Sequence, residues 1–109
     1  MVSEKIIDVD DNTFHAEVEQ AKMPVLADFG ATWCGPCKSL GATLGGMTKS
    51  YAGRIKFCYI DIQKAPLASQ KYAVRSVPTL ILFNNGTPSG SLLGAQPKAR
   101  IEELISTVL

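Results

Sequence analysis

The stretch Val25–Lys38, VLADFGATWCGPCK, decides the fold of this chain. Its first five residues, Val25–Phe29, form an apolar run broken only by Asp28, and so short a run is typical of a buried strand. Pro36 suits the first turn of a helix, because the N–H that it lacks has no partner there. Apolar residues then recur at helical spacing, at Leu40, Leu44, Met47 and Tyr51. We therefore predict a strand, a turn with two cysteines, and a helix.

Around this unit, the apolar pattern predicts further strands and helices. Strands are expected at Lys5–Val9, Ile55–Ile62, Pro78–Phe83 and Ser89–Leu93, with a hairpin turn at Asn84–Gly86. Helices are expected after the N-cap candidates Asp10, Asp11 and Asn12, at Pro66–Val74, and from Pro97 to the end. The order is β-α-β-α-β-α-β-β-α. We predict an α/β fold, with a mixed sheet of about five strands and about four helices covering both faces.

Length and composition limit the possible classes of protein. The chain has 109 residues, 46% hydrophobic and 19% charged, so we expect a single domain over residues 1–109. The net charge is +1 without a basic stripe, and no apolar stretch approaches the roughly 20 residues that cross a membrane. Neither nucleic acid nor a membrane is an expected partner. Met1–Asn12 lacks the apolar segment of a signal peptide, so we expect a cytoplasmic location, with export by another route or an earlier removed leader as the alternatives. We expect the protein to act as a monomer.

The cysteine pair predicts redox chemistry. Cys34 would lie at the N-terminus of the helix, where unpaired N–H groups and the helix dipole favour a thiolate and lower its pKa. Cys37 would lie one turn further, underneath and less exposed, at a spacing that lets the two sulfurs form a disulfide. The Cys34 thiolate can attack a disulfide in a partner protein, and Cys37 can then release that partner. This chemistry needs no cofactor besides the cysteine pair.

A structural zinc site is another use of two cysteines at this spacing. Such a site needs two more ligands, and the remaining candidates, Cys58 and His15, form no second paired motif. No metal is therefore expected. We interpret Cys58, in a predicted strand, as a small core residue, with a regulatory thiol as the alternative. His15 lies among acidic residues of the first helix and is expected at the surface.

The sequence resembles the thioredoxin family over essentially its whole length. Trp33–Lys38 matches the active-site motif of that family in full, and Val25–Phe29 resembles the strand that precedes it. Val77–Thr79 is similar to the family's segment with a cis-proline, and Asn85-Gly86 and Gly94-Ala95 also match. The resemblance implies the thioredoxin fold and the reduction of protein disulfides.

The resemblance also implies roles for the matching residues. Cys34 would be the nucleophile, Cys37 the resolving thiol, and Asp28 the buried proton acceptor for Cys37. Pro78 would be cis, and the backbone of Val77 would pair with an extended segment of the client protein. A flat docking surface would consist of Trp33, Gly35, Pro36, Gly94 and Ala95. A thioredoxin reductase would recharge the dithiol, which implies a part in electron transport and cell redox homeostasis, with disulfide-containing client proteins as the other partners.

Three of these residues also have plainer interpretations. Asp28 could be a hydrogen-bonded structural acid, although burial near a reactive pair would raise its pKa toward neutrality and suit proton exchange. Pro78 could begin a strand with a trans bond, as most X–Pro bonds do. Trp33 could belong to the core.

Three features depart from the family pattern. Gly30 replaces a usual tryptophan, which predicts a looser active-site loop, easier solvent access to Asp28 or a shifted reduction potential. Tyr59 replaces a common lysine, so we expect desolvation rather than a charge pair to govern the pKa of Asp28. The helix after the dithiol holds several glycines, which predicts a pliable helix unless they allow close packing against a neighbour. These are Gly41, Gly45 and Gly46, with Ala42 in place of a usual proline.

Three functions compete at this point. The leading prediction is a general protein-disulfide reductase. The second is an oxidase or isomerase, but such relatives often carry a histidine between the cysteines, where this chain has Gly35-Pro36. The third is a binding module that uses the fold as a scaffold, which the intact Trp33–Lys38 motif disfavours as the sole role.

Overall fold

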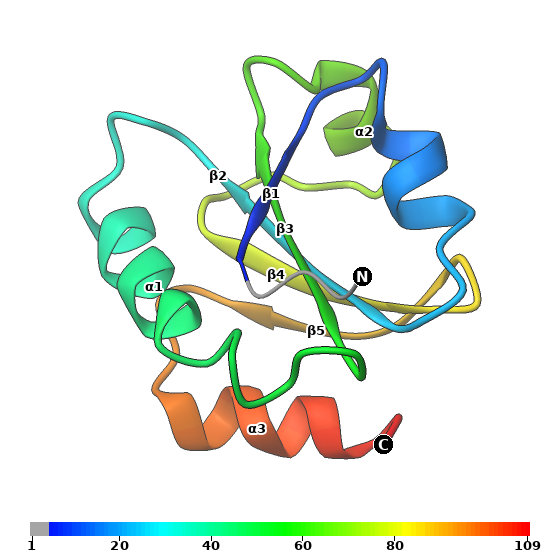
Figure 1. The fold of residues 1–109 in the computed structure, drawn as a ribbon. Helices are drawn as coiled ribbons and strands as arrows, with labels where there is room; N and C mark the ends of the chain where they lie inside the picture. The colour runs from blue at the N-terminus through cyan, green and yellow to red at the C-terminus, as the bar shows by residue number, and fades with distance from the viewer. Residues whose placement is uncertain (1–4) are drawn as a thin grey trace.

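The computed structural model describes residues 5–109, and residues 1–4 of the predicted domain lie outside them. Helices cover both faces of a five-stranded mixed sheet (Figure 1), which confirms the predicted fold class. The strands are β1 (Ile7–Val9), β2 (Val25–Gly30), β3 (Lys56–Asp61), β4 (Thr79–Asn84) and β5 (Thr87–Leu93). The helices are a short π-helix, η1 (His15–Glu19), and the α-helices α1 (Gly35–Gly45), α2 (Pro66–Lys71) and α3 (Lys98–Ser106). None of these helices within residues 5–109 is long and apolar enough to cross a membrane.

Strand β2 lies at the centre of the sheet. The strand order is β1-β3-β2-β4-β5; β1, β3 and β2 are parallel, and β4 runs antiparallel to both β2 and β5. Every residue of β2 is buried, which agrees with its apolar run. Within this strand Asp28 is in register with Tyr59 of β3 and with Leu80 of β4. The cysteine turn therefore begins at the carboxyl end of the central strand, a common place for a functional site in α/β folds.

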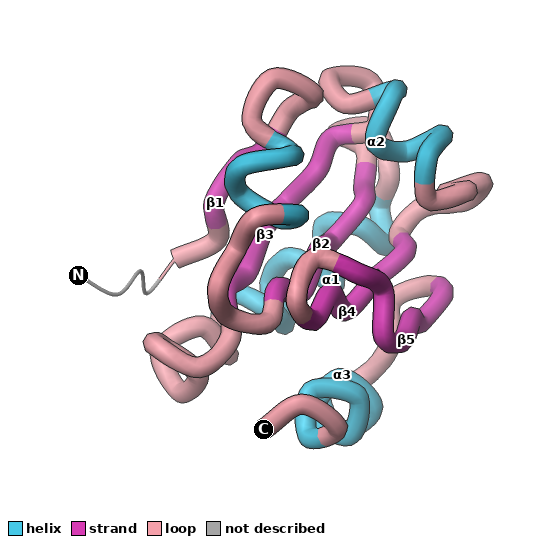
Figure 2. The backbone as a smooth tube through the Cα atoms, turned by 90° about the vertical axis from the view of Figure 1, so that its right-hand side faces the viewer, coloured by secondary structure: helices cyan, strands magenta, loops and turns pink. Residues whose placement is uncertain are grey.

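The two faces of the sheet pack against different helices, because alternate residues of a strand point to opposite faces. Val25, Ala27 and Phe29 of β2 pack with the segments around η1 and α2, and Leu26 packs with α1 and α3. Figure 1 shows α1 and α3 on one side of the strands and α2 on the other, and Figure 2 shows α2 above the strands and α3 below them. The apolar residues predicted at helical spacing after Pro36 are all buried: Leu40, Leu44, Met47 and Tyr51. Apolar residues in and around η1 and α3 are buried or half-buried as well: Phe14, Val18, Ala21, Ile101, Leu104, Ile105 and Val108.

Two of the three predicted N-cap residues accept backbone N–H groups, but in different segments. Asp10 Oδ1 accepts a hydrogen bond from the backbone N–H of Asn12 at 2.9 Å, in the turn before η1, whose own N-cap residue is Phe14. Asp11 instead caps α2, because its two carboxylate oxygens accept the N–H groups of Leu67 and Ala68, each at 3.0 Å. Asp11 and Leu67 are 56 positions apart, so spacing in the sequence could not reveal this cap.

Helix α1 is shorter than the apolar spacing predicted. It ends at Gly45 with Gly46 as its C-cap, and the turns that follow still bury Met47 and Tyr51. Of the three glycines, only Gly41 therefore lies in the helix interior. A Cβ on Gly41 or Gly45 would meet nothing within 4 Å, so the alternative of close packing against a neighbour is wrong.

The hairpin between β4 and β5 has the backbone that its sequence predicted. Asn85 and Gly86 have φ angles of 54° and 80°, the left-handed region that both central residues of a tight hairpin turn require. A Cβ on Gly86 would also collide with the backbone carbonyl of Glu19. The hairpin thus packs closely against the end of η1, and glycine is required there.

Candidate active site

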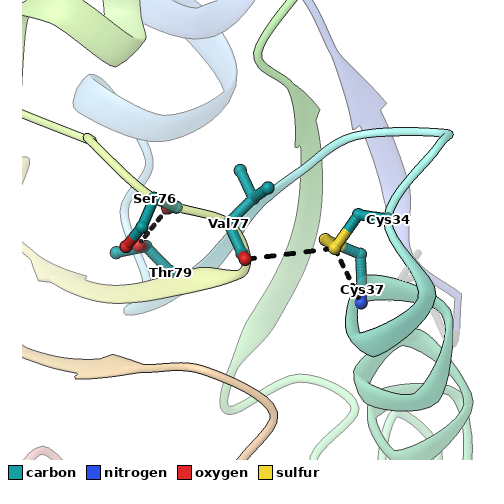
Figure 3. Close-up of a disulfide and its surroundings, with 5 residues drawn as sticks. All are labelled: Cys34, Cys37, Ser76, Val77 and Thr79. Atoms are coloured by element: carbon teal, nitrogen blue, oxygen red, sulfur yellow. Dashed lines mark hydrogen bonds between the residues drawn. A yellow bond between two sulfur atoms is a disulfide. The ribbon is translucent and has the colours of Figure 1, made fainter.

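Cys34 and Cys37 form a disulfide at the N-terminus of α1. Cys34 is the N-cap residue of the helix, and its Cα lies 5.2 Å from the Cα of Cys37. The Sγ atom of Cys34 accepts a hydrogen bond from the backbone N–H of Cys37 at 3.2 Å (Figure 3). Pro36 occupies the first turn, as predicted. This N–H is one of the donors that a helix start leaves without an intrahelical partner, and it can hold a Cys34 thiolate after reduction.

Both cysteines are nearly covered in the disulfide form. Cys34 is 6% exposed and Cys37 is 5% exposed, so the expected difference in their exposure is negligible in this form. Trp33, directly before them, is 67% exposed. Trp33 therefore lies at the surface and its assignment to the core is wrong, whereas its docking role stays a prediction.

The segment before β4 faces the disulfide. The Val77–Pro78 peptide bond is cis, as the resemblance implied. The carbonyl oxygen of Val77 lies 3.9 Å from the Sγ atom of Cys34, and Figure 3 shows this oxygen pointing at the disulfide. On the other side of Pro78, the hydroxyl of Thr79 donates a hydrogen bond to the carbonyl of Ser76 at 2.7 Å and closes the turn.

The other predicted docking residues gather at the same end of the sheet. The N–H of Gly94 donates a hydrogen bond to the carbonyl of Pro78 at 2.9 Å, which joins the loop after β5 to the cis-proline segment. Gly94 has a φ of 81°, which explains its glycine. Leu93, 64% exposed beside it, is an apolar surface residue that we did not predict. Of the remaining docking residues, Gly35, Pro36 and Ala95 are exposed, Val77 is half-buried, and Pro78 is buried.

Asp28 lies buried on the face of the sheet that α1 covers. It is 1% exposed, and its Oδ1 atom has no hydrogen-bond partner among residues 5–109. The interpretation of Asp28 as a hydrogen-bonded structural acid therefore does not fit this oxygen. Burial raises the pKa of Asp28 to about 7, and no charged partner within residues 5–109 contributes, as the departure at Tyr59 predicted. The carboxyl group can thus change its protonation state near neutral pH.

Two of the departures from the family pattern, Gly30 and Tyr59, are in contact. A Cβ on Gly30 would lie 2.9 Å from Cε1 of Tyr59 and 3.4 Å from both the Tyr59 hydroxyl oxygen and the Sγ atom of Cys37. The ring of Tyr59 therefore fills the space that Gly30 leaves. Easier solvent access to Asp28, one expected consequence of Gly30, is not found, because Asp28 remains buried. The sequence named both residues but not their contact, which depends on the register of β2 and β3.

Two hollows meet at Tyr59. The first, of about 320 Å³, reaches Cys37 and is lined by Ala31, Thr32, Cys37, Lys38 and Tyr59. The second, of about 220 Å³, shares Thr32 and Tyr59 with the first and is also lined by Asp8, Val9, Asp10, Asp61 and Lys64. Tyr59 therefore lines both the hollow that reaches Cys37 and the one beside charged residues of the surface. Neither Thr32 nor Lys38 had been assigned to the site itself from the sequence.

Cys58 and His15 lie away from the dithiol. Cys58 is 1% exposed and belongs to the cluster on the sheet face opposite to Asp28. Burial raises the pKa of the Cys58 thiol to about 12, so the interpretation of Cys58 as a small core residue is supported over a regulatory thiol. The side chain of His15 is 71% exposed, as expected, with its Nδ1 atom 3.0 Å from Oε1 of Glu19. The structure does not bring either residue to Cys34 and Cys37.

Comparison with known proteins agrees with this geometry. The sequence model of the family described as Thioredoxin matches residues 5–107. A chloroplastic M-type thioredoxin of Pisum sativum is 38% identical over 97 residues, which are 89% of this chain and 56% of that protein. The thioredoxin of Pseudomonas aeruginosa is 38% identical over 100 residues, 92% of this chain and 93% of that protein. Thioredoxin C-2 of Corynebacterium nephridii is 34% identical over 104 residues, 95% of this chain and 96% of that protein. The chain thus spans little more than half of the chloroplastic relative and almost all of the two bacterial ones.

Proposed function

The chain belongs to the thioredoxin family, and on that premise we propose that it is a thiol–disulfide oxidoreductase that reduces disulfides of other proteins. One observation carries the proposal: the Cys34–Cys37 disulfide lies at the start of α1, where the N–H of Cys37 donates to the Cys34 sulfur. A helix N-terminus stabilises negative charge, so it favours the thiolate that initiates exchange. The same sulfur faces the Val77 carbonyl, at the end of the sheet where exposed apolar residues gather.

The first half of the reaction forms a mixed disulfide. In the reduced protein, the Cys34 thiolate attacks one sulfur of a client disulfide. A bond forms between Cys34 and that sulfur, and the client's own S–S bond breaks. The second client sulfur leaves as a thiolate and takes up a proton from solvent. An extended client segment beside the Val77 carbonyl, with Trp33 and Leu93 as apolar contacts, would hold the client disulfide against Cys34.

The second half of the reaction releases the client. Cys37 loses its thiol proton and attacks the Cys34 sulfur, which forms the Cys34–Cys37 disulfide and breaks the bond to the client. The client leaves as a thiolate and is protonated, so two electrons have passed from the dithiol to the client. Asp28 takes up the Cys37 proton in this scheme. Because burial raises the pKa of Asp28 to about 7, this carboxyl group can accept a proton near neutral pH and return it to water later.

Repeated turnover requires a donor that reduces Cys34–Cys37 again. We assign this step to a thioredoxin reductase, because the family works with such enzymes. The chain then carries electrons from the reductase to its clients, as a monomer, with the cysteine pair as its only redox group. This work suits the cytoplasm, where the thiol pool is kept reduced.

Trapping the mixed disulfide tests the proposal. A reduced Cys37→Ser variant mixed with insulin should accumulate a covalent adduct that dithiothreitol dissolves, because the resolving thiol is gone. The matched Cys34→Ser variant should give no adduct, because the N-cap position that favours a thiolate and faces Val77 belongs to Cys34, and Cys58 lies in the core on the other face of the sheet. Equal adduct formation by both variants would contradict the assignment of Cys34 as the nucleophile.

A redox titration against glutathione separates reductase from oxidase. A reductase should have a reduction potential more negative than about −230 mV, below the range of glutaredoxins. A potential nearer to about −120 mV would identify an oxidant instead, and the assignment as a reductase would fail.

A further inference from the structure

The contact between Gly30 and Tyr59 places an aromatic ring beside both groups of the resolving step. Residues Leu26, Asp28 and Gly30 share the α1-facing side of β2, because side chains alternate along a strand. The Cβ position on Gly30 lies 3.4 Å from the Cys37 sulfur and 2.9 Å from the Tyr59 ring. Asp28, one step back along the same face, is in register with Tyr59 across β2 and β3. Tyr59 is therefore adjacent to the proton acceptor and to the cysteine that must lose its proton.

Tyr59 lies between the strand position of the buried carboxyl group and the hollow beside Cys37. The hollow beside Cys37 holds about 320 Å³ and has Tyr59 as part of its wall, whereas Asp28 is only 1% exposed. On its other side Asp28 is in register with Leu80, an apolar residue that is 0% exposed. Toward β3, the residue in register with Asp28 is Tyr59, which is itself only half-buried.

We propose that Tyr59 is a positioning residue for Cys37: its ring, seated over Gly30, closes the hollow off from Asp28 and so sets how readily Cys37 passes its proton to that carboxyl group. The inference rests on the proposed function, because it concerns the step in which Cys37 resolves the mixed disulfide. Gly30 is part of the same arrangement, since any side chain there would displace the ring.

The charges around Tyr59 keep its phenol protonated in this role. Burial raises the pKa of Tyr59, and the carboxylates of Asp61, Asp28 and Asp8 raise it further. From the other elements around the ring, Lys38 of α1 lines the hollow beside Cys37, and Asp10 and Lys64 line the second hollow. The Tyr59 side chain is therefore uncharged near neutral pH. The neighbouring group that titrates in this pH range is Asp28.

The test compares variants that remove the hydroxyl, the ring, or the space for the ring. Tyr59→Phe keeps the ring, Tyr59→Ala removes it, and Gly30→Ala pushes it aside. For each variant, carbon-13 NMR gives the titration midpoint of the Asp28 carboxyl group. Rapid mixing of the reduced variant with insulin gives the pH profile of mixed-disulfide resolution. Gly41→Ala, in open space on α1, is the matched glycine control.

The ring, not the hydroxyl, should control proton exchange. Tyr59→Ala should lower the Asp28 midpoint by about one pH unit or more, because water then reaches the carboxylate, and the pH profile should shift with it. Tyr59→Phe and Gly41→Ala should leave unchanged both the titration midpoint of Asp28 and the midpoint of the pH profile of mixed-disulfide resolution. Gly30→Ala should shift them in the native background and have no effect in the Tyr59→Ala background, where its Cβ no longer meets a ring.

Two results would overturn the inference: the first would leave the proposed function intact, and the second would contradict its mechanism as well. Equal Asp28 midpoints in the native protein, Tyr59→Ala and Gly30→Ala would show that Tyr59 does not shelter the carboxyl group, even where insulin is reduced normally. An Asp28→Asn variant with a native pH profile would instead show that Asp28 takes no part, and the mechanism under the proposed function would fail together with the inference. If Tyr59→Ala does not fold, the Asp28 midpoint in Gly30→Ala alone still decides whether the Tyr59 ring keeps water from the Asp28 carboxyl group.

Discussion

The sulfur of Cys34 and the carbonyl oxygen of Val77 face each other at 3.9 Å, although the two residues are 43 positions apart. The register of the sheet explains this approach. Phe29 of β2 is paired with Thr79 of β4 in antiparallel fashion, so the residues after β2 and those before β4 lie at the same end of the sheet. The cysteine turn and the cis-proline segment therefore face each other at one end of the sheet, where we propose that a client binds.

Trp33 should contribute to client binding without stabilising the fold. Its side chain is 67% exposed beside Cys34, so Trp33→Ala should lower kcat/KM for insulin reduction about tenfold, or about 1.4 kcal/mol of transition-state stabilisation. The urea midpoint should stay the same. Leu67→Ala is the matched control, because Leu67 is 69% exposed but lies on α2, which covers the opposite side of the sheet. Equal losses of kcat/KM in the two variants would show that Trp33 is not a docking residue.

Asp28 should make the stability of the oxidised protein depend on pH. Its pKa is raised from 3.8 to about 7, so between these values the folded state holds a proton that the unfolded state releases. Stability should therefore fall as the pH rises from about 4 to about 7, by on the order of 4 kcal/mol in total. Asp28→Asn should lack this fall. Urea unfolding of the native protein and of Asp28→Asn at pH 4 and pH 8 measures this fall. Parallel pH dependences in the two proteins would contradict the raised pKa of Asp28.

Glu19 should stabilise the fold with the opposite dependence on pH. Burial alone would raise its pKa, but hydrogen bonds from Lys71, Tyr72 and His15 outweigh this and lower the pKa to about 2. The stabilisation should be complete above about pH 4.5 and lost as the pH falls toward 2. At pH 7, Glu19→Gln should cost about 1.5–3 kcal/mol, the range for hydrogen bonds to a charged group.

A surface pair supplies the control for Glu19. Nη1 of Arg100 lies 3.8 Å from Oε1 of Glu103, and the two side chains are 54% and 74% exposed. Glu103→Gln should therefore lower the free energy of unfolding by about 1 kcal/mol at most. Urea unfolding at pH 7 and pH 3 measures the loss of unfolding free energy in Glu19→Gln and in Glu103→Gln. If Glu19→Gln is as mild as Glu103→Gln at pH 7, the Glu19 hydrogen bonds contribute no more than a surface pair.

Two glycines should respond to alanine in opposite directions. Gly41 lies inside α1 with open space at its Cβ position, so Gly41→Ala should stabilise the protein by about 0.5–1 kcal/mol. Gly94 has open space as well, but its φ of 81° is strained for alanine, so Gly94→Ala should destabilise. Thermal unfolding of both variants measures the difference. A loss of stability in Gly41→Ala would show that α1 needs this glycine.

The sequence predicted the elements of the fold well where an apolar run has a clear period. Strand β2, the helix that starts at the cysteine pair and the Asn85-Gly86 turn were all predicted, since each depends on neighbouring residues. The end of α1 was not predicted, because turns beyond Gly45 bury Met47 and Tyr51 as a continued helix would.

The parts of the site that depend on register could not be predicted. The sequence identified Gly30 and Tyr59 as separate departures, but a one-residue slip between β2 and β3 would move Tyr59 to the other face of the sheet. The Asp11 cap on α2 and the exposure of Leu93 beside Gly94 likewise depend on contacts between distant segments. Local motifs thus located the reactive cysteines, whereas the surroundings that tune them required the tertiary structure.

Whether Cys34 and Cys37 reduce protein disulfides is measured directly by the rate at which the protein reduces insulin with dithiothreitol as the electron donor. The native protein should accelerate the reaction well above the rate with dithiothreitol alone, and a Cys34→Ser, Cys37→Ser double variant should return it to that rate. No acceleration by the native protein, or equal acceleration by the double variant, would contradict a disulfide reductase that acts through Cys34 and Cys37.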